Sequence, residues 1–364
     1  MKKLLVLFAI AFLTLSSLAA CAPKAEVEEE PTGYELALVT DIGTIDDKSF
    51  NQGAWEGLKQ YADENGISYK YYQPTEKSTD AYVAAIELAV ENGAKVVVTP
   101  GFLFEPAIFI AQDMFPEVKF VLLDGFPQDG TYTEFRIEEN VYSVFYAEEQ
   151  VGFLAGYAAV KDGYTNLGFM GGMAVPAVVR FGYGFVQGAN YAAAELGITV
   201  SLKYKYLGGF GPTPEYQTEA ATWFQGGTQV IFAAAGGAGN SVMAAAEANN
   251  GKVIGVDIDQ SAESTTVITS AMKGLGISVY NALADYYAGS FKGKESVSLG
   301  VDVDGVSLPS DFSRFATFTE ADYTAIYEKL VADTDGVRTN IKKDTDVAAA
   351  SELPVTNVTV EVIE

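Results

Sequence analysis

The stretch Tyr34-Glu-Leu-Ala-Leu-Val-Thr40 is an apolar run of strand length, and Asn51 to Asn65 behind it has the pattern of an amphipathic helix. The same alternation of a short apolar run and a helical segment continues as far as Asp124. Runs rich in valine and leucine that alternate with helices are typical of a parallel sheet covered on both faces. The opening stretch therefore predicts an α/β fold.

The alternation can be followed through two halves of the chain. The first half is predicted to hold strands at 34–40, 67–73, 95–99 and 119–124 and helices at 51–65, 79–91 and 105–114. A helical segment at 145–161 follows. The second half then repeats the pattern, with strands at 166–170, 200–207, 229–234 and 252–256 and helices at 180–196, 215–224 and 241–249. Two copies of one architecture in tandem predict two Rossmann-like lobes with parallel sheets.

Residues that directly follow the predicted strands are the first candidates for a binding site. In open α/β sheets a ligand binds outside the carboxyl ends of the strands. Each such residue taken alone could equally be a turn residue or a helix cap. Their recurrence at one edge in both halves favours a shared cleft. The candidates are Asp41, Asp124, Gly171, Gly172, Phe210, Gly236, Gly237 and Asp257.

The N-terminal residues have the features of an export signal. Lys2 and Lys3 precede an unbroken apolar stretch at 4–13, which is too short for a bilayer that needs roughly 20 residues. Residues 1–20 are therefore predicted to be a signal peptide. The sequence Leu18-Ala-Ala-Cys21 resembles a bacterial lipobox, which implies lipidation of Cys21. Residues 21–33 contain four glutamates and would form an acidic tether. We expect an extracytoplasmic protein, lipid-anchored to a bacterial membrane.

The composition disfavours several chemistries. Cys21 is the only cysteine and the chain has no histidine, so a disulfide, the commonest general base and the usual zinc ligands are missing. Asp257 and Asp259 flank Ile258 and would share one strand face as two ligands of a cation, but no third acidic ligand is nearby. The sequence at 236–239 is glycine-rich but lacks the lysine of a phosphate-binding loop. We expect no enzyme, no metal and no cofactor.

The net charge is −25, from 48 acidic and 23 basic residues. A negative field of this size repels nucleic acid, which is therefore not an expected partner. With 364 residues, of which 49% are hydrophobic, the chain is long enough to bury the cores of two lobes.

Residues 41–57 read Asp-Ile-Gly-Thr-Ile-Asp-Asp-Lys-Ser-Phe-Asn-Gln-Gly-Ala-Trp-Glu-Gly and resemble the opening motif of the basic membrane protein family. That family comprises bacterial substrate-binding lipoproteins of ABC transporters, including purine nucleoside receptors. The resemblance covers nearly the whole mature chain. It continues at 99–102, 120–124, 153–157, 168–173, 181–185, 233–237, 255–260 and 269–273.

The resemblance implies a type I periplasmic-binding-protein fold, in which three crossovers link the lobes and the ligand is buried between them. It also implies that the chain returns to the first lobe near Gly274 with a helix at 277–291. The expected N-terminal lobe is 34–142 with 274–298, and the expected C-terminal lobe is 143–273 with 299–352. The acidic tail, 353–364, matches nothing in the family; residues 355–362 alternate and form either an edge strand or a disordered end.

The implied ligand is a purine nucleoside (inosine, guanosine or adenosine), and the implied partners are an ABC permease and its ATPase. Aromatic stacking on a base contributes about 1–3 kcal/mol. The family motif gives this role to Phe50. For the facing aromatic we prefer Phe210, with Phe181 next, although phenylalanine at either position could belong to the core.

Polar groups of the nucleoside have candidate partners as well. Asp124 is expected to accept hydrogen bonds from the base edge, with Asn51 adding a contact; because a carboxylate only accepts, inosine and guanosine are favoured. Asp257 is expected to bind the ribose 2′ and 3′ hydroxyls, and Lys273 to donate to a ribose oxygen. The glycines at 171, 172, 236 and 237 would allow the backbone to approach the ligand.

Other functions remain open at this point. Related lipoproteins differ in ligand, so a receptor for riboflavin or another small heterocycle is the first alternative. A sensor that binds a small molecule and docks on a membrane receptor is the second. A nucleoside-processing enzyme is disfavoured because the chain has no histidine.

Overall fold

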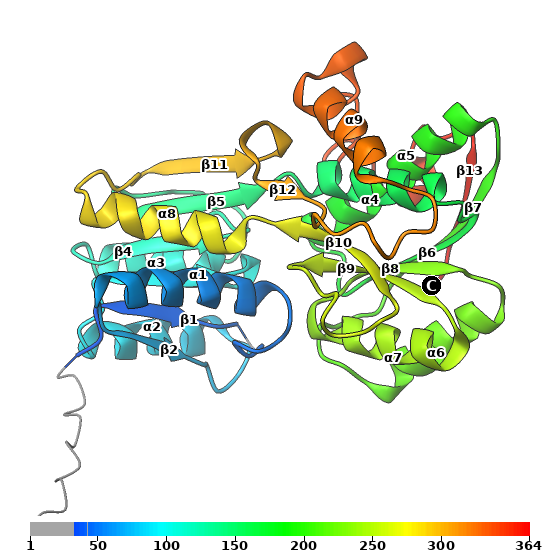
Figure 1. Cartoon of the computed structure of the whole chain (residues 1–364). Coiled ribbons are helices and arrows are strands. Elements are labelled where there is room, and N and C mark those ends of the chain that lie inside the picture. The colour runs from blue at the N-terminus through cyan, green and yellow to red at the C-terminus, as the bar shows by residue number, and fades with distance from the viewer. Residues whose placement is uncertain (1–32, 42) are drawn as a thin grey trace, which may run out of the picture. The chain divides into compact units, whose positions relative to one another are not determined.

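The computed structural model describes residues 33–41 and 43–364 (Figure 1). The predicted signal peptide, Cys21 and the tether up to residue 32 lie outside the described residues. Within the described part of the chain, no helix has the length and apolar character needed to cross a membrane.

The first sheet has six strands in the order β11-β5-β4-β3-β1-β2, and all neighbours pair in parallel. The strands are β1 (Leu36–Val39), β2 (Tyr69–Tyr72), β3 (Val96–Pro100), β4 (Lys119–Leu123), β5 (Val141–Tyr146) and β11 (Glu295–Leu299). The helices packed on this sheet are α1 (Phe50–Asn65), α2 (Thr79–Glu91), α3 (Glu105–Met114) and α8 (Leu275–Tyr287). We call this unit the N-terminal lobe.

The second sheet has seven strands in the order β12-β10-β9-β8-β6-β7-β13, parallel except for the pair β10 and β12. The strands are β6 (Asn166–Gly171), β7 (Val200–Tyr206), β8 (Val230–Ala234), β9 (Lys252–Asp257), β10 (Val267–Lys273), β12 (Val306–Ser307) and β13 (Val358–Val362). Its helices are α4 (Glu148–Lys161), α5 (Pro176–Leu196), α6 (Pro214–Gln225), α7 (Gly239–Asn249) and α9 (Glu320–Val331). We call this unit the C-terminal lobe.

Short 3₁₀ helices complete the described secondary structure, at Phe102–Phe104, Gly236–Ala238, Val301–Val303, Thr334–Gly336 and Ala350–Glu352.

Strand β1 shows why the first sheet is covered on both faces. Its four residues are all buried, and successive side chains of a strand point to opposite faces. Leu36 and Leu38 share a core with α1 residues, while Ala37 and Val39 share another with residues of α2 and α3.

The chain passes between the lobes three times, at Ala147, Gly274 and Gly300, each a connection of one residue between assigned elements. After the second passage, α8 (yellow in Figure 1) lies beside α1 (blue), although more than two hundred residues separate them. Two parallel sheets with three crossovers form the type I periplasmic-binding-protein fold, which confirms the predicted fold class.

Several element assignments from the sequence were wrong in detail. Residues 145 and 146 belong to β5 and not to the predicted helix at 145–161, which begins at Glu148. The apolar run of β5 is separated from that helix by Ala147 alone, so no turn residue marks the boundary. Strand β10 was not predicted, and α8 ends at Tyr287 rather than at residue 291. With β5 in the first sheet, we propose 34–146 and 275–299 as the N-terminal lobe.

The alternating end of the chain forms an edge strand, the first of the two alternatives for this segment. β13 pairs in parallel with β7 from Val358–Val200 to Val362–Tyr204. The side-chain oxygen of Asn190 on α5 accepts from the backbone N–H groups of Thr356 and Asn357 and aligns the strand.

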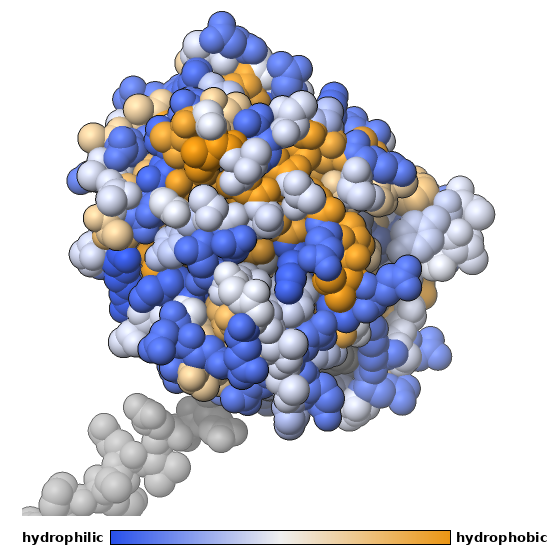
Figure 2. All heavy atoms as spheres, turned by 90° about the vertical axis from the view of Figure 1, so that its right-hand side faces the viewer, coloured by the Kyte–Doolittle hydropathy of each residue, from blue (hydrophilic) through white to orange (hydrophobic). Residues whose placement is uncertain are grey.

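Figure 2 looks onto the right-hand side of Figure 1, where apolar residues gather among hydrophilic ones.

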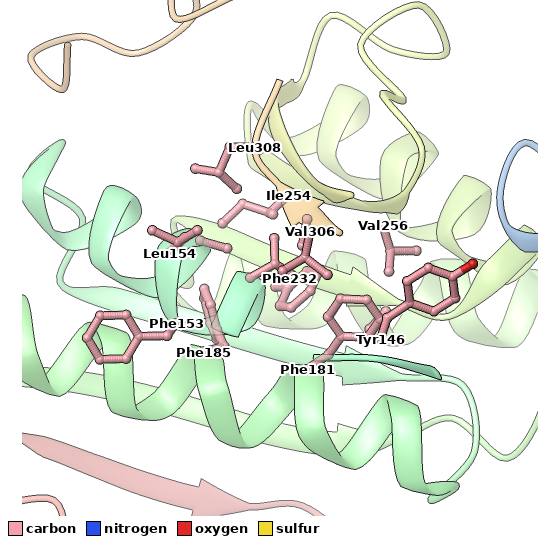
Figure 3. Close-up of a cluster of buried hydrophobic side chains, with 14 of the residues drawn as sticks. Tyr146, Phe153, Leu154, Phe181, Phe185, Phe232, Ile254, Val256, Val306 and Leu308 are labelled. Carbon is pink, nitrogen blue, oxygen red and sulfur yellow. The ribbon is translucent and has the colours of Figure 1, made fainter. Parts of the chain in front are cut away.

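The core of the C-terminal lobe is built around α4 and α5, which make the densest helix contact of the described chain. Glycines permit this approach: a Cβ on Gly152 would lie 2.3 Å from the carbonyl oxygen of Phe181, and one on Gly184 would lie 2.1 Å from that of Glu149. Figure 3 shows the aromatic and aliphatic side chains that fill the space beside these helices. The close packing fixes the first turns of α4 and α5 relative to each other.

Candidate ligand-binding cleft

A cleft of about 710 Å³ lies between the two lobes, within the range of small-molecule sites. Both lobes contribute lining residues from the segments that follow the carboxyl ends of strands. Of the ten residues predicted from the sequence to bind the ligand, nine line the cleft: Asp41, Phe50, Asn51, Asp124, Phe181, Phe210, Gly236, Asp257 and Lys273. Gly237 lines it as well.

Gly172 does not line the cleft, and this prediction is corrected. A Cβ at Gly172 would lie 2.3 Å from the ring of Phe210, so the glycine makes room for that ring and does not itself face the ligand space. Gly171 likewise packs inside the lobe, where a Cβ would lie 2.7 Å from Val178 and 2.8 Å from Tyr206.

A cluster of buried charges stands at the centre of the cleft lining. The ammonium of Lys273, at the end of β10, lies 2.5 Å from Oδ2 of Asp124, 2.9 Å from Oε1 of Glu148 and 4.0 Å from Oδ1 of Asp257. The Lys273 side chain is 2% exposed, and the three carboxylates are between 1% and 10% exposed. One buried cation thus faces three buried anions, drawn from both lobes.

The backbone turns sharply at two of these carboxylates. Asp124 follows β4 with φ 52°, and Asp257 ends β9 with φ 68°. Left-handed backbone is unfavourable for a residue with a side chain, and aspartate tolerates it better than most. Such residues gather at binding and catalytic sites, where the surrounding structure maintains the strain. The turn after each strand therefore supports Asp124 and Asp257 as site residues.

The environment of the cluster shifts its protonation equilibria. Burial raises the pKa of Asp124 to about 7, against the opposing effect of Lys273, and burial also raises the pKa of Asp257. Burial lowers the pKa of Lys273, but Asp124, Glu148 and Asp257 together outweigh it and hold that pKa above its ordinary value. Oδ1 of Asp124 is buried without a hydrogen-bond partner among the described residues.

A second polar cluster surrounds the start of α1. The carboxylate of Asp47 accepts from the backbone N–H groups of Ser49, Asn51 and Gln52 and so caps the helix. The side-chain amide of Asn51 donates to Asp47 over 2.9 Å and to Asp41 over 3.1 Å. Its carbonyl oxygen, Oδ1, is buried without a partner in the described chain. The amide is thus oriented by two carboxylates and keeps its acceptor unused.

The three candidate aromatics differ in burial. Phe50 and Phe210 are half-buried, on α1 and on the loop after β7 respectively. Phe181 is 2% exposed and packs edge-on against Phe232, with ring centroids 5.7 Å apart (Figure 3). The ammonium of Lys273 lies 4.9 Å from the ring centre of Phe50. Phe50 and Phe210 therefore have ring surface to offer, and Phe181 belongs mainly to the core.

Four residues that sequence reasoning did not single out contribute to the charge and hydrogen-bond network of this site. Glu148 and Arg180 line the cleft, with Arg180 Nη1 3.6 Å from Glu148 Oε2. Asp47 lines it too, and the Ser49 hydroxyl donates to Oδ2 of Asp257 over 2.5 Å. Asp47 and Ser49 stand inside the quoted motif at 41–57 and could have been singled out there. Glu148 reads as an ordinary acidic residue in the first turn of a helix.

The charged residues that line the cleft are mostly acidic. The acidic ones are Asp41, Asp46, Asp47, Glu105, Asp124, Glu148 and Asp257, and the basic ones are Lys77, Arg180 and Lys273. An excess of negative charge in the cleft lining disfavours an anionic ligand. Among residues 33–41 and 43–364, no group of three or more possible His, Cys, Asp or Glu ligands is arranged to hold a metal ion.

A cleft at the carboxyl ends of two parallel sheets, lined by unused acceptors and aromatic rings and flanked by three crossovers, defines a solute-binding protein. A sequence profile described as "ABC transporter substrate-binding protein PnrA-like" matches residues 34–338. The chain belongs to this family, as the resemblance to basic membrane proteins had indicated.

Individual relatives agree with this assignment. An ABC transporter nucleoside-binding protein from Lactococcus lactis is 30% identical over 85% of this chain and 92% of its own length. Basic membrane protein A1 from Borrelia garinii is 30% identical over 83% of this chain and 86% of its own length. The crystal structure of an ABC transporter solute-binding protein from Aeropyrum pernix, 26% identical, matches with a TM-score of 0.67 over 88% of this chain and 90% of that one.

The family sets the general role of the chain. It is an ABC transporter substrate-binding protein, which works outside the cytoplasm, takes up a small molecule and delivers it to a permease driven by an ATPase. The relatives from Lactococcus lactis and Aeropyrum pernix are named as binding proteins.

Proposed function

We propose that the protein captures a purine nucleoside in the interlobe cleft for import and is tethered to the membrane by lipid at Cys21. Two buried oxygens carry the ligand proposal: Asp124 Oδ1 and Asn51 Oδ1 have no partner among the described residues. A buried acceptor without a partner costs about 1–3 kcal/mol, so a ligand that brings donors recovers this energy. Inosine and guanosine each bring one ring N–H, guanosine and adenosine bring an exocyclic amine, and all three bring sugar hydroxyls.

The grouping of the polar residues supports a sugar-binding role for Asp124, whereas the sequence led us to expect that Asp124 binds the base edge. Asp124 and Asp257 both surround Lys273, so the vicinal hydroxyls of a ribose fit this cluster, with Lys273 donating to a sugar oxygen. Asp41 and Asn51 form the other cluster and suit the base edge. We assign the sugar to the first cluster and the base to the second.

The two half-buried rings and a relative support the choice of a nucleoside. Phe50 and Phe210 come from different lobes and both line the cleft, an arrangement in which a flat base can stack between them. The Lactococcus lactis relative is named a nucleoside-binding protein. The acidic excess of the lining favours an uncharged nucleoside over a phosphorylated one.

Two measurements test the ligand. Mass spectrometry of small molecules released from the purified protein by mild denaturation should detect a purine nucleoside. Calorimetric titration should then give tighter binding for inosine or guanosine than for riboflavin, free hypoxanthine or uridine. Riboflavin as the released and tighter ligand would replace the nucleoside proposal with the first alternative.

The receptor role has its own tests. Incubation with excess inosine should yield no hypoxanthine above background, and product formation would contradict a role in binding alone. Permease and ATPase genes next to the gene of this protein support transport, whereas a membrane sensor gene in their place supports the sensor alternative.

A further inference from the structure

The last part of the chain lies along the helix that forms one wall of the cleft. The family profile ends at residue 338, and the chain continues beside α5. The side-chain amide of Gln187 exchanges two hydrogen bonds with the backbone of Lys342, 3.0 and 2.8 Å long. Ile341 and Ala350 are buried in the same core as α5. The segment 339–350 is therefore a fixed part of the C-terminal lobe.

One side chain of this segment reaches a residue of the cleft. Oδ1 of Asp344 accepts from Nε of Arg180 over 2.7 Å, and Oδ2 lies 3.5 Å from Nη2. This two-point contact holds the planar guanidinium in one orientation. Arg180 lines the cleft, whereas Asp344 does not. Asp344 thus touches the ligand space only through Arg180.

Arg180 in turn belongs to the buried charge cluster. Its Nη1 lies 3.6 Å from Oε2 of Glu148, and Oε1 of the same carboxylate lies 2.9 Å from the Lys273 ammonium. The remaining charged groups beside this row are Glu149, which pairs with Lys343 over 3.1 Å, and the two aspartates around Lys273, Asp124 and Asp257. The charges alternate in sign from Asp344 through Arg180 and Glu148 to Lys273.

We propose that Asp344 is a positioning residue for ligand binding, which sets the charge balance of the cleft by binding Arg180 in competition with Glu148. The proposal rests on the function proposed above, because it concerns the same cleft. It assigns a role to a residue that lies beyond the stretch matched by the family profile.

The direction of the effect follows from the sign of each charge. When Asp344 is neutral, Arg180 loses one anionic partner and turns fully to Glu148. Glu148 then compensates Lys273 less, and the positive charges act more strongly on Asp124 and Asp257. The loss of the negative charge of Asp344 itself also makes it easier for Asp124 to ionise. Both effects lower the pH at which Asp124 ionises, by about half to one pH unit for a charge interaction of this kind.

The experiment compares three variants of the purified protein with the wild type. Asp344→Asn removes the charge and keeps the shape. Asp344→Glu restores a carboxylate that reaches Arg180. Asp346→Asn is the matched control, because Asp346 is exposed, lies in the same segment and, among the described residues, accepts only from the backbone N–H of Lys343. The carboxyl titration of Asp124 is followed without ligand by ¹³C NMR of labelled aspartate, assigned through Asp124→Asn.

Asp344→Asn should move the Asp124 midpoint to lower pH, while Asp344→Glu and Asp346→Asn should leave it near that of the wild type. The midpoint of the pH profile of inosine binding should move in the same direction. An unchanged titration in Asp344→Asn, even with a lowered melting temperature, would overturn the proposal. A shifted titration without inosine binding in the wild type would instead contradict the proposed ligand, so the two failures are distinguishable.

Discussion

The hydroxyl of Ser49 donates to Oδ2 of Asp257 over 2.5 Å, although 208 positions separate the two residues in the sequence. Ser49 precedes α1 in the N-terminal lobe, and Asp257 ends β9 in the C-terminal lobe. The bond therefore joins the lobes directly at the cleft. It uses one carboxylate oxygen, while Oδ1 of Asp257 lies 4.0 Å from the Lys273 ammonium and is the oxygen that we propose for ligand binding.

Asp257→Ala should weaken the binding of inosine by about tenfold to a hundredfold, because loss of a charged hydrogen-bond partner costs about 1.5–3 kcal/mol of binding free energy. Free hypoxanthine has no sugar and should be almost unaffected. Asp259→Ala is the control: within the described part of the chain, Oδ1 of Asp259 accepts only from the backbone N–H of Ser261, so both affinities should stay unchanged. Calorimetry with the two ligands, beside a melting curve without ligand, provides the comparison. Equal losses for both ligands would refute the ribose assignment.

Alanine substitutions of Phe210 and Phe181 should have different effects, the first mainly on ligand binding and the second mainly on stability. Phe210→Ala removes a half-buried ring from the cleft and should cost about 1–3 kcal/mol in nucleoside binding, with a smaller effect on stability. Phe181→Ala opens a cavity in the core and should lower the free energy of unfolding by about 3–5 kcal/mol. Urea denaturation and inosine titration of both variants check this. A larger loss of binding in a still stable Phe181→Ala would reverse the roles.

Stability should depend on pH through Asp124. Burial raises its pKa from 3.8 to about 7, so the folded protein retains a proton that the unfolded chain releases between these values. This contribution is fully present below about pH 4 and is lost as the pH rises through 7, at about 1.4 kcal/mol per pKa unit. Asp124→Asn cannot ionise. Its unfolding free energy, relative to wild type, should rise by about 1–3 kcal/mol from pH 5 to pH 8; parallel curves would contradict this.

Phosphorylated nucleosides should bind poorly. Seven acidic and three basic residues line the cleft, and like charges at a protein site repel more strongly than in bulk water. We expect inosine 5′-monophosphate to bind at least about a hundredfold more weakly than inosine at low ionic strength. Added salt should narrow this gap because it screens the repulsion. Equal affinities for the two compounds, measured by calorimetry, would show that the acidic lining does not select against phosphate.

Membrane attachment should depend on Cys21 alone. The residue lies outside the described structure, and the described part of the chain has no helix able to cross a membrane. Cys21→Ser, expressed in the native host, should yield exported protein in the soluble fraction. Wild-type protein, processed in parallel, should partition with membranes. A variant that remains with the membrane fraction would contradict the lipid anchor.

Much of the fold was predictable because its periodicity is local. Helices α2 and α3 were predicted with the bounds that the structure has, at 79–91 and 105–114. Strand β5 was missed because Val141–Tyr146 and the next helix are separated by one alanine. Strand β10 was missed because Thr269, Ser270 and Lys273 interrupt the apolar run of Val267–Lys273, which is buried on both faces.

The site was predictable where the residues stand directly after strands or in the opening motif. Asp124 and Asp257 were found in this way, and Lys273 was found through the family resemblance at 269–273; all three line the cleft. Glu148 and Arg180 were not, because a glutamate or an arginine in the first turns of a helix is usually a solvated residue. Only the close packing of α4 on α5, permitted by Gly152 and Gly184, brings these two charges together beside Lys273.

The crossover at Gly274 has a consequence for the order in which the protein assembles. Strand β11, at 295–299, completes the sheet of the N-terminal lobe by pairing with β5, and α8 covers α1. Both elements are synthesised after the strands β6 to β10 of the other lobe. A nascent chain that has grown only to residue 273 thus carries a five-stranded first sheet with an open edge at β5 and an uncovered helix α1. The N-terminal lobe is begun first and finished only after most of its partner has emerged.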